Sequence, residues 1–474
     1  MECYREPARD VPLLGTWDIL VIGGGAAGCA AAITAGRLGA RVLLAERYGF
    51  LGGATVSQLV AHILSTNGVD FQGIWHDWIR AIRARRADAA CELVGTRGKY
   101  LFRGGVDPEV VKYAWDDLVS AAGCTQLLHA TVSSAIIEDG VCAGAVFDTR
   151  SGRRAVRAQR IIDCTGDAVF CDAAGIPWAQ GNGTNPWNQS LTTVFRMGNV
   201  QWPTEGYPPA EVDAKRALAA EKAADKTYDC PVVANGRAVT YPLANWVHQS
   251  VAPYRTEMNV FSSRVLRVDT LDPFDMTRAE REGREQAWQC ASFARAHLRG
   301  YEKAYLLDTG MHIGLRDSRR VQGLECVTKD DALSFRKRPD GIARSSWDID
   351  IWPAESYDAP AVPRDEPLYK ERMRRMAEDG EYFDIPYGCL VADGAKNLLV
   401  AGRCISAERE AQASLRIQQT CQATGEAAGF AAARSIESRC SPDGKDDSAF
   451  VRELAVMRDK IVPAFDLLRD VTIA

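Results

Sequence analysis

Several features are missing from this sequence, and each absence excludes a class of protein. No run of about 18 apolar residues occurs, and Met1–Leu14 carries charges throughout, so neither a membrane span nor a secretory signal is predicted. The fourteen cysteines include no C-x-x-C pair, which gives no sign of a zinc site or a redox dithiol. The formal net charge of -5 offers no general attraction to nucleic acid or an anionic membrane. We therefore expect a cytoplasmic protein, without metal, whose partners include a small-molecule substrate.

The composition fits a globular chain with more than one core. Of the 474 residues, 46% are hydrophobic and 25% are charged. Strand and helix signals alternate up to residue 181 and return after residue 385, whereas tryptophan, proline and tyrosine are frequent between them. We expect an α/β fold in which a nucleotide-binding domain, residues 15–181 and 385–440, contains an inserted α+β substrate (cap) domain, residues 182–384. Residues 441–474 are expected to form a C-terminal tail.

A βαβ unit is predicted at the start of the first domain. Trp17–Ile22 is a short apolar run suited to a buried parallel strand. Ala26–Leu38 is rich in alanine, contains no proline and stops before a glycine, which predicts a helix. Arg41–Glu46 then indicates a second strand, so the turn between the first strand and the helix becomes the feature of interest.

That turn carries the spacing G-x-G-x-x-G. Gly23 permits a tight turn, Gly25 lets the backbone approach a pyrophosphate, and Gly28 lets the helix pack closely on the strand. The helix N-terminus attracts phosphate through its free amides. Glu46, at the end of the second strand, can accept both hydroxyls of a ribose. The combination predicts a Rossmann-like site for a dinucleotide whose adenosine ribose carries no 2′-phosphate.

Further elements are predicted along the rest of the chain. The stretch from Trp75 to Ala122 looks helical, with Asp107 and Pro108 opening a helix. A charged helix is expected from Met276 to His297, beginning after Asp275, and an alanine-rich helix from Thr424. Strands are expected at Gln126–His129, Ser133–Ile137, Val141–Asp148, Arg160–Asp163 and Asn397–Gly402.

Four segments resemble a known family. They are Gly49–Thr55, Asp163–Asp167, Gly314–Arg320 and the stretch from Ala401 through Gly429. These segments resemble the FAD-dependent oxidoreductases related to the fumarate reductase and succinate dehydrogenase flavoproteins, over about Trp17 to Ala433. The resemblance implies that the dinucleotide is FAD and that the domain built on the glycine turn is a Rossmann-like FAD-binding domain.

The resemblance also implies which residues surround the cofactor. The C-terminal glycine turn and helix are expected to approach the flavin pyrimidine, and the segment from Gly52 to Thr55 is expected to pass close to the flavin ring. The candidate cofactor-binding residues are Gly23, Gly25, Ala27, Gly28, Glu46, Arg47, Gly52, Gly53, Ala54, Thr55, Thr131, Val132, Gly166, Asp167, Gly402, Arg403, Gly425, Ala427 and Ala428.

Three positions depart from the family pattern. No histidine lies in the glycine-rich segment before Gln58, so FAD is expected to bind without a covalent bond. Trp352 stands where the family has a histidine after Asp-Ile, and any catalytic role of that histidine is absent from this chain. Glu426 stands where glutamine is common, which is expected to change the electric field near the flavin pyrimidine.

The candidate catalytic residues lie after the inserted domain's midpoint. Arg316, Arg319 and Arg320 follow His312 closely, so the arginines are candidates to hold a carboxylate and the histidine to exchange a proton. The alternative is that Arg316 pairs with Asp317 and that the other arginines lie at a domain interface. Tyr387, Arg403 and Ser406 are further candidates to face the flavin, although a buried aromatic, a surface cation and a helix cap are equally good interpretations. His248 is a candidate to touch substrate, and a structural role is favoured there.

These features favour an FAD-dependent dehydrogenase or oxidase that transfers a hydride between a small organic molecule and FAD. A second G-x-G-x-x-G motif is absent, which argues against a built-in NAD(P)H domain. The electron acceptor is therefore expected to be external: oxygen, a quinone or a carrier protein. The alternatives are a flavin-dependent monooxygenase and a non-catalytic FAD-binding scaffold. The direction of the reaction and the oligomeric state stay open.

Overall fold

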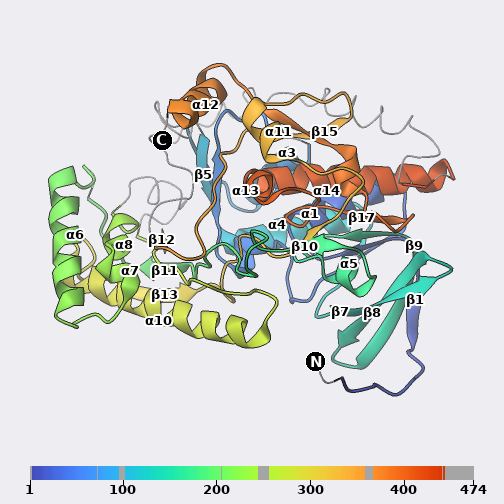
Figure 1. The fold of residues 1–474 in the computed structure, drawn as a ribbon, viewed down its shortest axis with the longest axis horizontal. Coiled ribbons are helices and arrows are strands. Elements are labelled where there is room, and N and C mark those ends of the chain that lie inside the picture. Colours follow the sequence, from blue (N-terminus) through green and yellow to red (C-terminus); the bar gives the residue numbers. More distant parts are fainter. Residues whose placement is uncertain are drawn as a thin grey trace.

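The protein is described here from a computed structural model that covers residues 3–71, 73–94, 102–203, 205–243, 256–357, 367–439 and 441–442. The chain forms a mixed α/β fold around a seven-stranded, mostly parallel sheet, which confirms the expected class (Figure 1). Most of the expected C-terminal tail and His248 lie outside the described residues. Among the described residues, no helix combines the length and the apolar character needed to cross a membrane.

The central sheet has β1 and β9 at its middle. Its order is β6-β2-β1-β9-β8-β7, and β17 pairs with the end of β9 that β8 leaves uncovered. The pairs among β6, β2, β1, β9 and β17 are parallel, whereas β8 and β7 join as antiparallel strands. The strands are β1 (Leu13–Ile22), β2 (Val42–Ala45), β6 (Thr125–Leu127), β7 (Thr131–Glu138), β8 (Val141–Thr149), β9 (Gly152–Asp163) and β17 (Leu398–Val400).

Two helices, α1 (Ala26–Arg37) and α14 (Gln418–Glu437), pack tightly against each other beside this sheet (Figure 1). The contact depends on glycine, because a Cβ atom at Gly425 would lie 2.0 Å from the carbonyl oxygen of Ala27. One turn further on, a Cβ atom at Gly429 would lie 2.2 Å from the carbonyl oxygen of Ala31. The missing side chains let the two backbones approach and bring the first turn of α14 close to the glycine turn that precedes α1.

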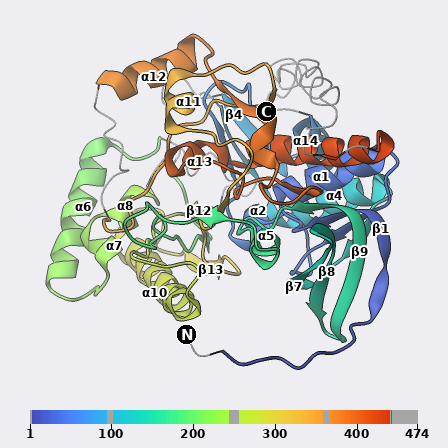
Figure 2. The ribbon, with the colours of Figure 1, turned by 45° about the vertical axis from the view of Figure 1, so that its right-hand side comes forward.

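A second group of elements has a hydrophobic core of its own. Its core side chains run from Phe195 to Ala304, and its elements lie apart from the central sheet in two views (Figures 1 and 2). Val321, Ala343 and Phe383 instead join the core of the central sheet. The domain boundaries at residues 182 and 384 stay predictions. The elements are β11 (Phe195–Gly198), α6 (Pro209–Ala224), α7 (Pro231–Ala234), α8 (Arg237–Thr240), β12 (Met258–Val260), α10 (Pro273–His297) and β13 (Tyr305–Thr309).

The prediction of one helical stretch from Trp75 to Ala122 is wrong in its middle. Helices α3 (Ile74–Arg85) and α4 (Pro108–Ala121) form its ends, and Asp107 caps α4 as expected. Between them, β4 (Ala90–Val94) and β5 (Phe102–Val106) pair with each other and with β3 (His62–Ser65), because tertiary pairing overrides a weak helical pattern.

Two helices begin earlier than predicted. α10 begins at Pro273, three residues before the expected start, because the carboxylate of Asp272 accepts the amides of Phe274 and Asp275 and so caps the helix. α14 begins six residues before Thr424. The remaining elements are α2 (Ala54–Ser57), α5 (Val169–Ala173), β10 (Trp178–Ala179), β14 (Arg320–Val321), α11 (Lys329–Ser334), β15 (Gly341–Ser345), α12 (Pro367–Glu378), β16 (Phe383–Pro386), the short 3-10 helix Tyr387–Leu390 and α13 (Arg409–Leu415).

A buried carboxyl group, Asp70, lies next to the start of α14. It accepts hydrogen bonds from the Ser65 hydroxyl and, at 3.2 Å, from the Gln419 amide. Burial raises the pKa of Asp70 from 3.8 to about 6. The pKa of Asp70 is higher in the folded chain than in the unfolded chain. The contribution of Asp70 to the stability of the fold is therefore complete below pH 3.8, and it is lost as the pH rises through about 6.

Replacing Asp70 by asparagine should therefore stabilise the fold at high pH. We expect Asp70→Asn to raise the free energy of unfolding by on the order of 2 kcal/mol at about pH 8 and to change it little at about pH 4. Urea unfolding of both proteins across this range measures the difference. An unchanged dependence of stability on pH in the variant would contradict the assignment.

Candidate cofactor and substrate site

The glycine turn between β1 and α1, residues 23–28, leaves open space beside its backbone. We call this turn and the space beside it the cradle. Gly23 has φ +102, and a Cβ atom at Gly28 would lie 1.7 Å from the Gly23 carbonyl oxygen, so both positions exclude a side chain. Gly25 differs, because a Cβ atom there would meet only the Cα atom of Gly53, at 3.7 Å. None of the residues that the structure describes therefore requires glycine at residue 25, and the space beside it fits a group that approaches the backbone.

Glu46 lies beside this turn at the end of β2. Its carboxylate accepts the amides of Gly24 at 2.6 Å and Tyr48 at 2.9 Å, and the residue is buried. Burial raises the pKa of Glu46, while the two amide hydrogen bonds act in the opposite direction. The side chain is thus fixed against the glycine turn, where a ribose of the bound dinucleotide is expected. The carbonyl oxygen of Glu46 also accepts the amide of Ala130, which brings the neighbouring Thr131 and Val132 to the same edge.

A second glycine segment approaches the cradle from α2. Gly52 has φ +117 and Gly53 has φ +53, and a Cβ atom at Gly53 would lie 2.8 Å from the Cα atom of Gly25. Ala54 is exposed, whereas Thr55 is buried and donates its hydroxyl to Oε1 of Gln418 at 2.5 Å. Gln418 is the first residue of α14, so this contact joins α2 to the helix expected at the flavin pyrimidine.

A partly buried ion pair joins two of the candidate segments. The Arg403 guanidinium donates to the Asp167 carboxylate at 2.7 Å, and the Ser318 hydroxyl donates to the same oxygen atom at 2.8 Å. Burial opposes ionisation of Asp167, but Arg403 and then Ser318 hold the pKa of that carboxyl below its usual range. Because the Nη1 atom of Arg403 is buried without a partner among the described residues, this arginine has a hydrogen-bond donor left for a ligand.

The other proposed cofactor residues lie around the same cradle. Arg47 is exposed and covers the ring of Tyr48. Gly166 lies against Arg403, since a Cβ atom at Gly166 would meet the Nη2 atom of Arg403 at 3.0 Å. At Gly402, φ is +85 and a Cβ atom would lie 2.9 Å from that of Ala27. Ala427 and Ala428 are buried in α14.

His312 lies against the α2 segment. Its Nδ1 atom is 2.9 Å from the carbonyl oxygen of Ile313, which can only accept, so Nδ1 carries the proton. Its Nε2 atom then carries a lone pair and lies 3.2 Å from the Ser57 hydroxyl, whose hydrogen also points to the carbonyl oxygen of Gly53 at 2.9 Å. Burial, followed by the charge of Arg47, lowers the pKa of His312 to about 4. The imidazole is therefore neutral at neutral pH, with Nε2 able to accept a proton.

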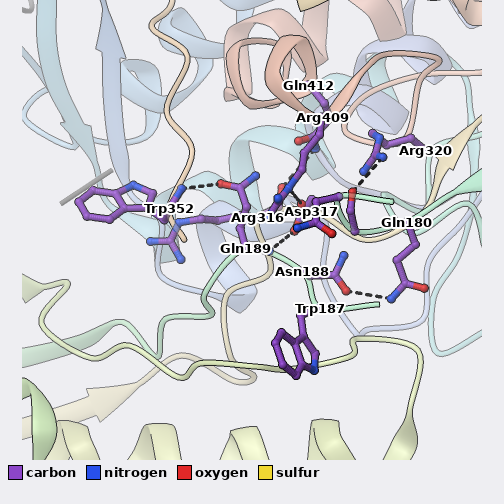
Figure 3. Close-up of polar contacts among 12 residues, drawn as sticks. Gln180, Trp187, Asn188, Gln189, Arg316, Asp317, Arg320, Trp352, Arg409 and Gln412 are labelled. Carbon is purple, nitrogen blue, oxygen red and sulfur yellow. Dashed lines mark hydrogen bonds and ion pairs between the residues drawn. The ribbon is translucent and has the colours of Figure 1, made fainter. Parts of the chain in front are cut away.

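The three arginines after His312 do not converge. Arg316 donates to the carbonyl oxygen of Ser190 and extends toward Trp352, whereas Arg320 lies on the opposite side of Asp317 and donates to the carbonyl oxygen of Gly181 (Figure 3). Arg319 pairs with Asp172 at 2.9 Å. The three guanidinium groups thus have separate partners and do not meet in this structure, and the expectation that these arginines hold a carboxylate stays a prediction. The alternative pair of Arg316 with Asp317 also fails, since the carboxylate of Asp317 lies 3.7 Å from Arg409.

Three other candidates have contacts outside the cradle. The Tyr387 hydroxyl donates to the carbonyl oxygen of Pro442, and the buried Ser406 donates its amide to the carbonyl oxygen of Cys389. The carboxylate of Glu426 accepts the amide of Ile74 at 3.2 Å and so caps the N-terminus of α3. The effect of Glu426 on the electric field near the flavin pyrimidine therefore stays a prediction. Its contact with α3 gives the side chain a structural role.

Sequence patterns missed two residues of the site, Gln418 and Ser57. Gln418 bridges Thr55 and the carbonyl oxygen of Val60, and its only sequence signal is its position at the start of an alanine-rich helix. Ser57 lies two residues after Thr55 and contacts His312, which is 255 residues away in the chain. No local sequence pattern predicts a contact between residues so far apart in the chain.

Comparisons with known proteins identify the family. The family described as FAD dependent oxidoreductase matches residues 18–454. A geranylgeranyl bacteriochlorophyll reductase-like protein from Thermoplasma acidophilum is 14% identical, with a TM-score of 0.44 over 94% of this chain and 83% of its own. The flavin-dependent brominase Bmp2 is 13% identical, with a TM-score of 0.47 over 93% of this chain and 84% of its own. Since likenesses at that level carry no argument, the assignment rests on the family match, which spans most of the chain. The protein belongs to the FAD-dependent oxidoreductase family, and its cofactor is FAD.

Proposed function

We propose that this protein is a dehydrogenase or oxidase that moves a hydride between a small organic substrate and non-covalently held FAD. Within its family we place it near the fumarate reductase and succinate dehydrogenase flavoproteins. The observation that carries the proposal is the contact of His312 with Ser57, because it puts a neutral imidazole against the segment expected to lie along the flavin ring.

The residues of the cradle fit FAD. The space beside Gly25, where the described part of the chain places only the Cα atom of Gly53, would accommodate a pyrophosphate at the N-terminus of α1. Glu46 would hold the adenosine ribose, and Arg403 has a buried donor for an anionic group. Gly53 lies close to Gly25, and Gly402 lies close to Ala27. Because neither glycine has a side chain, both present their backbone to the cradle. When bound, FAD supplies a centre that accepts or donates a hydride.

The chain's own residues would handle the proton that accompanies this transfer. The Ile313 carbonyl fixes the His312 tautomer, so that Nε2 faces the Ser57 hydroxyl as an acceptor. Oxidation of an alcohol or amine needs such an acceptor, and reduction of an alkene needs the protonated form. His312 is therefore the proposed proton-transfer residue. Arg316 is proposed to bind substrate, whereas Arg319, Tyr387 and Arg403 have the structural contacts given above.

A pH profile tests the role of His312. Because its pKa is lowered to about 4, we expect the rate of flavin reduction by substrate to stay level from about pH 8 to about pH 5 and to fall below that. His312→Gln should lower this rate by about 100-fold while leaving FAD content unchanged. Stopped-flow absorbance under anaerobic conditions measures both. An inflection near pH 6.5 in the unaltered protein would contradict the lowered pKa of His312, and an unchanged rate in the variant would remove His312 from the mechanism.

The decisive experiment combines a spectrum with a substrate panel. We expect flavin absorbance in the purified protein, and release of the flavin into the supernatant on acid precipitation, as non-covalent binding requires. Hydroxy, amino and carboxylic acids are then titrated anaerobically, and bleaching by one class names the substrate class. Reoxidation by oxygen, a quinone or a carrier protein identifies the electron acceptor. Direct bleaching by NADPH would instead favour a monooxygenase, and flavin inert to every reductant would favour a scaffold.

A further inference from the structure

The phenol ring of Tyr48 lies over the imidazole of His312. The two ring centres are 5.7 Å apart and the planes meet at 21°, a stacked arrangement within the range that aromatic pairs favour. On the Tyr48 ring also lie the Phe50 ring, stacked at 5.5 Å, and the guanidinium carbon of Arg47, 4.7 Å from the ring centre. We call Tyr48, Phe50 and His312 the aromatic stack. The proposed function uses only His312 of the three.

The main chain holds Tyr48 in place independently of His312. The Tyr48 amide donates to the Glu46 carboxylate at 2.9 Å, and the Tyr48 carbonyl oxygen accepts the amide of His129 at 3.0 Å. The next residue, Gly49, lies against His129, since a Cβ atom at Gly49 would lie 2.7 Å from a carbon atom of the imidazole. With both of its main-chain polar groups paired, Tyr48 is fixed by the protein itself. Its ring can therefore act as a firm surface for a neighbouring side chain.

The hydrogen-bond contacts of His312 leave the faces of its ring open. They run from the two ring nitrogens, which bond in the plane of the imidazole: Nδ1 to the Ile313 carbonyl oxygen at 2.9 Å and Nε2 to the Ser57 hydroxyl at 3.2 Å. Of the aromatic rings in the described part of the chain, only that of Tyr48 stacks on this imidazole. The Tyr48 ring thus covers a face that would otherwise meet water.

Removing water from an imidazole favours its neutral form. Burial is the largest cause that lowers the pKa of His312 to about 4, and the charge of Arg47 comes second. The charge of Arg403 acts in the same direction, whereas that of Asp167 acts in the opposite direction. The Glu280 carboxylate accepts the amide of the residue after His312 at 2.8 Å. Because burial comes first, the group that covers the ring is expected to influence its protonation more than any single charge.

We propose that Tyr48 is a positioning residue for His312. Its ring holds the plane of the imidazole beside Ser57 and keeps water from one face, so that the imidazole stays neutral and Nε2 stays available. Tyr48 also contacts Glu46, which is expected to hold the adenosine ribose, so this tyrosine joins the cofactor end of the site to the proposed proton-transfer residue. The role of His312 in proton transfer rests on the proposed function, whereas its placement by Tyr48 does not.

An NMR titration of the histidine side chains in the FAD-bound protein tests the proposal. The sequence has six histidines, and the His312 signal is the one missing from His312→Gln. In the unaltered protein we expect this imidazole to stay neutral from about pH 8 to about pH 5, because its pKa is lowered to about 4. In Tyr48→Ala, water reaches the uncovered face. We therefore expect half-protonation of His312 at about pH 5 or above, at least about one pH unit higher than in the unaltered protein.

Further variants separate the effect of the ring from a general change in packing. Tyr48→Phe keeps a ring over the imidazole, so its titration should match that of the unaltered protein. Tyr113→Ala is the matched control, because it removes a tyrosine that is 55% exposed on α4, and it should leave the His312 signal unchanged. Tyr48→Gln keeps much of the volume but replaces the ring by a hydrated amide. It carries the test, with the same expected rise in the pKa of His312, if Tyr48→Ala fails to fold or loses FAD.

Three results would overturn the proposal. They are a His312 signal that already titrates near pH 6.5 in the unaltered protein, an unchanged titration in Tyr48→Ala, and equal changes in Tyr48→Phe and Tyr48→Ala. The titration needs no substrate. A changed His312 titration in Tyr48→Ala, together with a rate of flavin reduction that His312→Gln does not alter, would therefore leave the placement standing and reject the proposed function.

Discussion

A Gly25→Ala variant is expected to fold normally and to purify without FAD. The added Cβ atom would meet only the Cα atom of Gly53, at 3.7 Å, which is an ordinary contact. Gly25 also has φ -78, a value that alanine adopts without strain. The methyl group would instead occupy the space in which the backbone approaches the pyrophosphate. The ratio of flavin absorbance to protein absorbance should therefore fall by at least about tenfold, as expected for a blocked phosphate contact.

Urea unfolding of FAD-free protein is the control that shows whether this variant folds normally. FAD-free preparations of the unaltered protein and of Gly25→Ala should unfold in urea with the same midpoint, because the substitution disturbs no contact among the described residues. Gly28→Ala provides the contrast, since its Cβ atom would lie 1.7 Å from the Gly23 carbonyl oxygen and must disturb the turn itself. Normal FAD content in Gly25→Ala would show that the pyrophosphate does not lie beside this glycine.

A Gly429→Ala variant is expected to lose stability, in contrast to the usual effect of this substitution in a helix. Alanine normally stabilises a helix relative to glycine by about 1 kcal/mol. Here the new Cβ atom would lie 2.2 Å from the carbonyl oxygen of Ala31, so α14 must move away from α1. We expect a net loss of about 2 kcal/mol in the free energy of unfolding, within the range for overpacked cores.

Urea unfolding of FAD-free protein measures this loss, and Gly25→Ala serves as the matched glycine-to-alanine control. FAD affinity should also fall in Gly429→Ala, because a displaced α14 carries Gln418 away from Thr55. A gain in stability would mean that the two helices have room to adjust, and that their close approach is not required by the fold.

Local sequence patterns were sufficient where one short segment makes the structure. The β1-turn-α1 unit, the cap of α4 by Asp107 and the strand β17 could be predicted, because periodicity, glycine spacing and capping act within a few residues. The cofactor followed from the same kind of signal together with a family resemblance. The strands β4 and β5 could not be predicted, since their stability comes from pairing with β3.

The substrate side of the site shows what sequence alone leaves open. The composition and the pattern of His312 with its three arginines suggested one anion-binding group, but the backbone of that segment sends the arginines to different sides. Trp352 was noticed only as a departure from a family motif, and the arginines beside it come from positions 237, 264 and 316.

The sequence by itself determined the nucleotide turn, the α/β class and the family, because these depend on contacts between neighbouring residues and on a motif with fixed spacing. Only the tertiary structure decided which side chains meet at the substrate side. His312 reaches Ser57 across 255 residues, and Arg264 reaches Trp352 across 88, so those pairings depend on how the helices and sheets pack. Packing of that kind is set by the shapes of whole surfaces, and no short stretch of sequence records it.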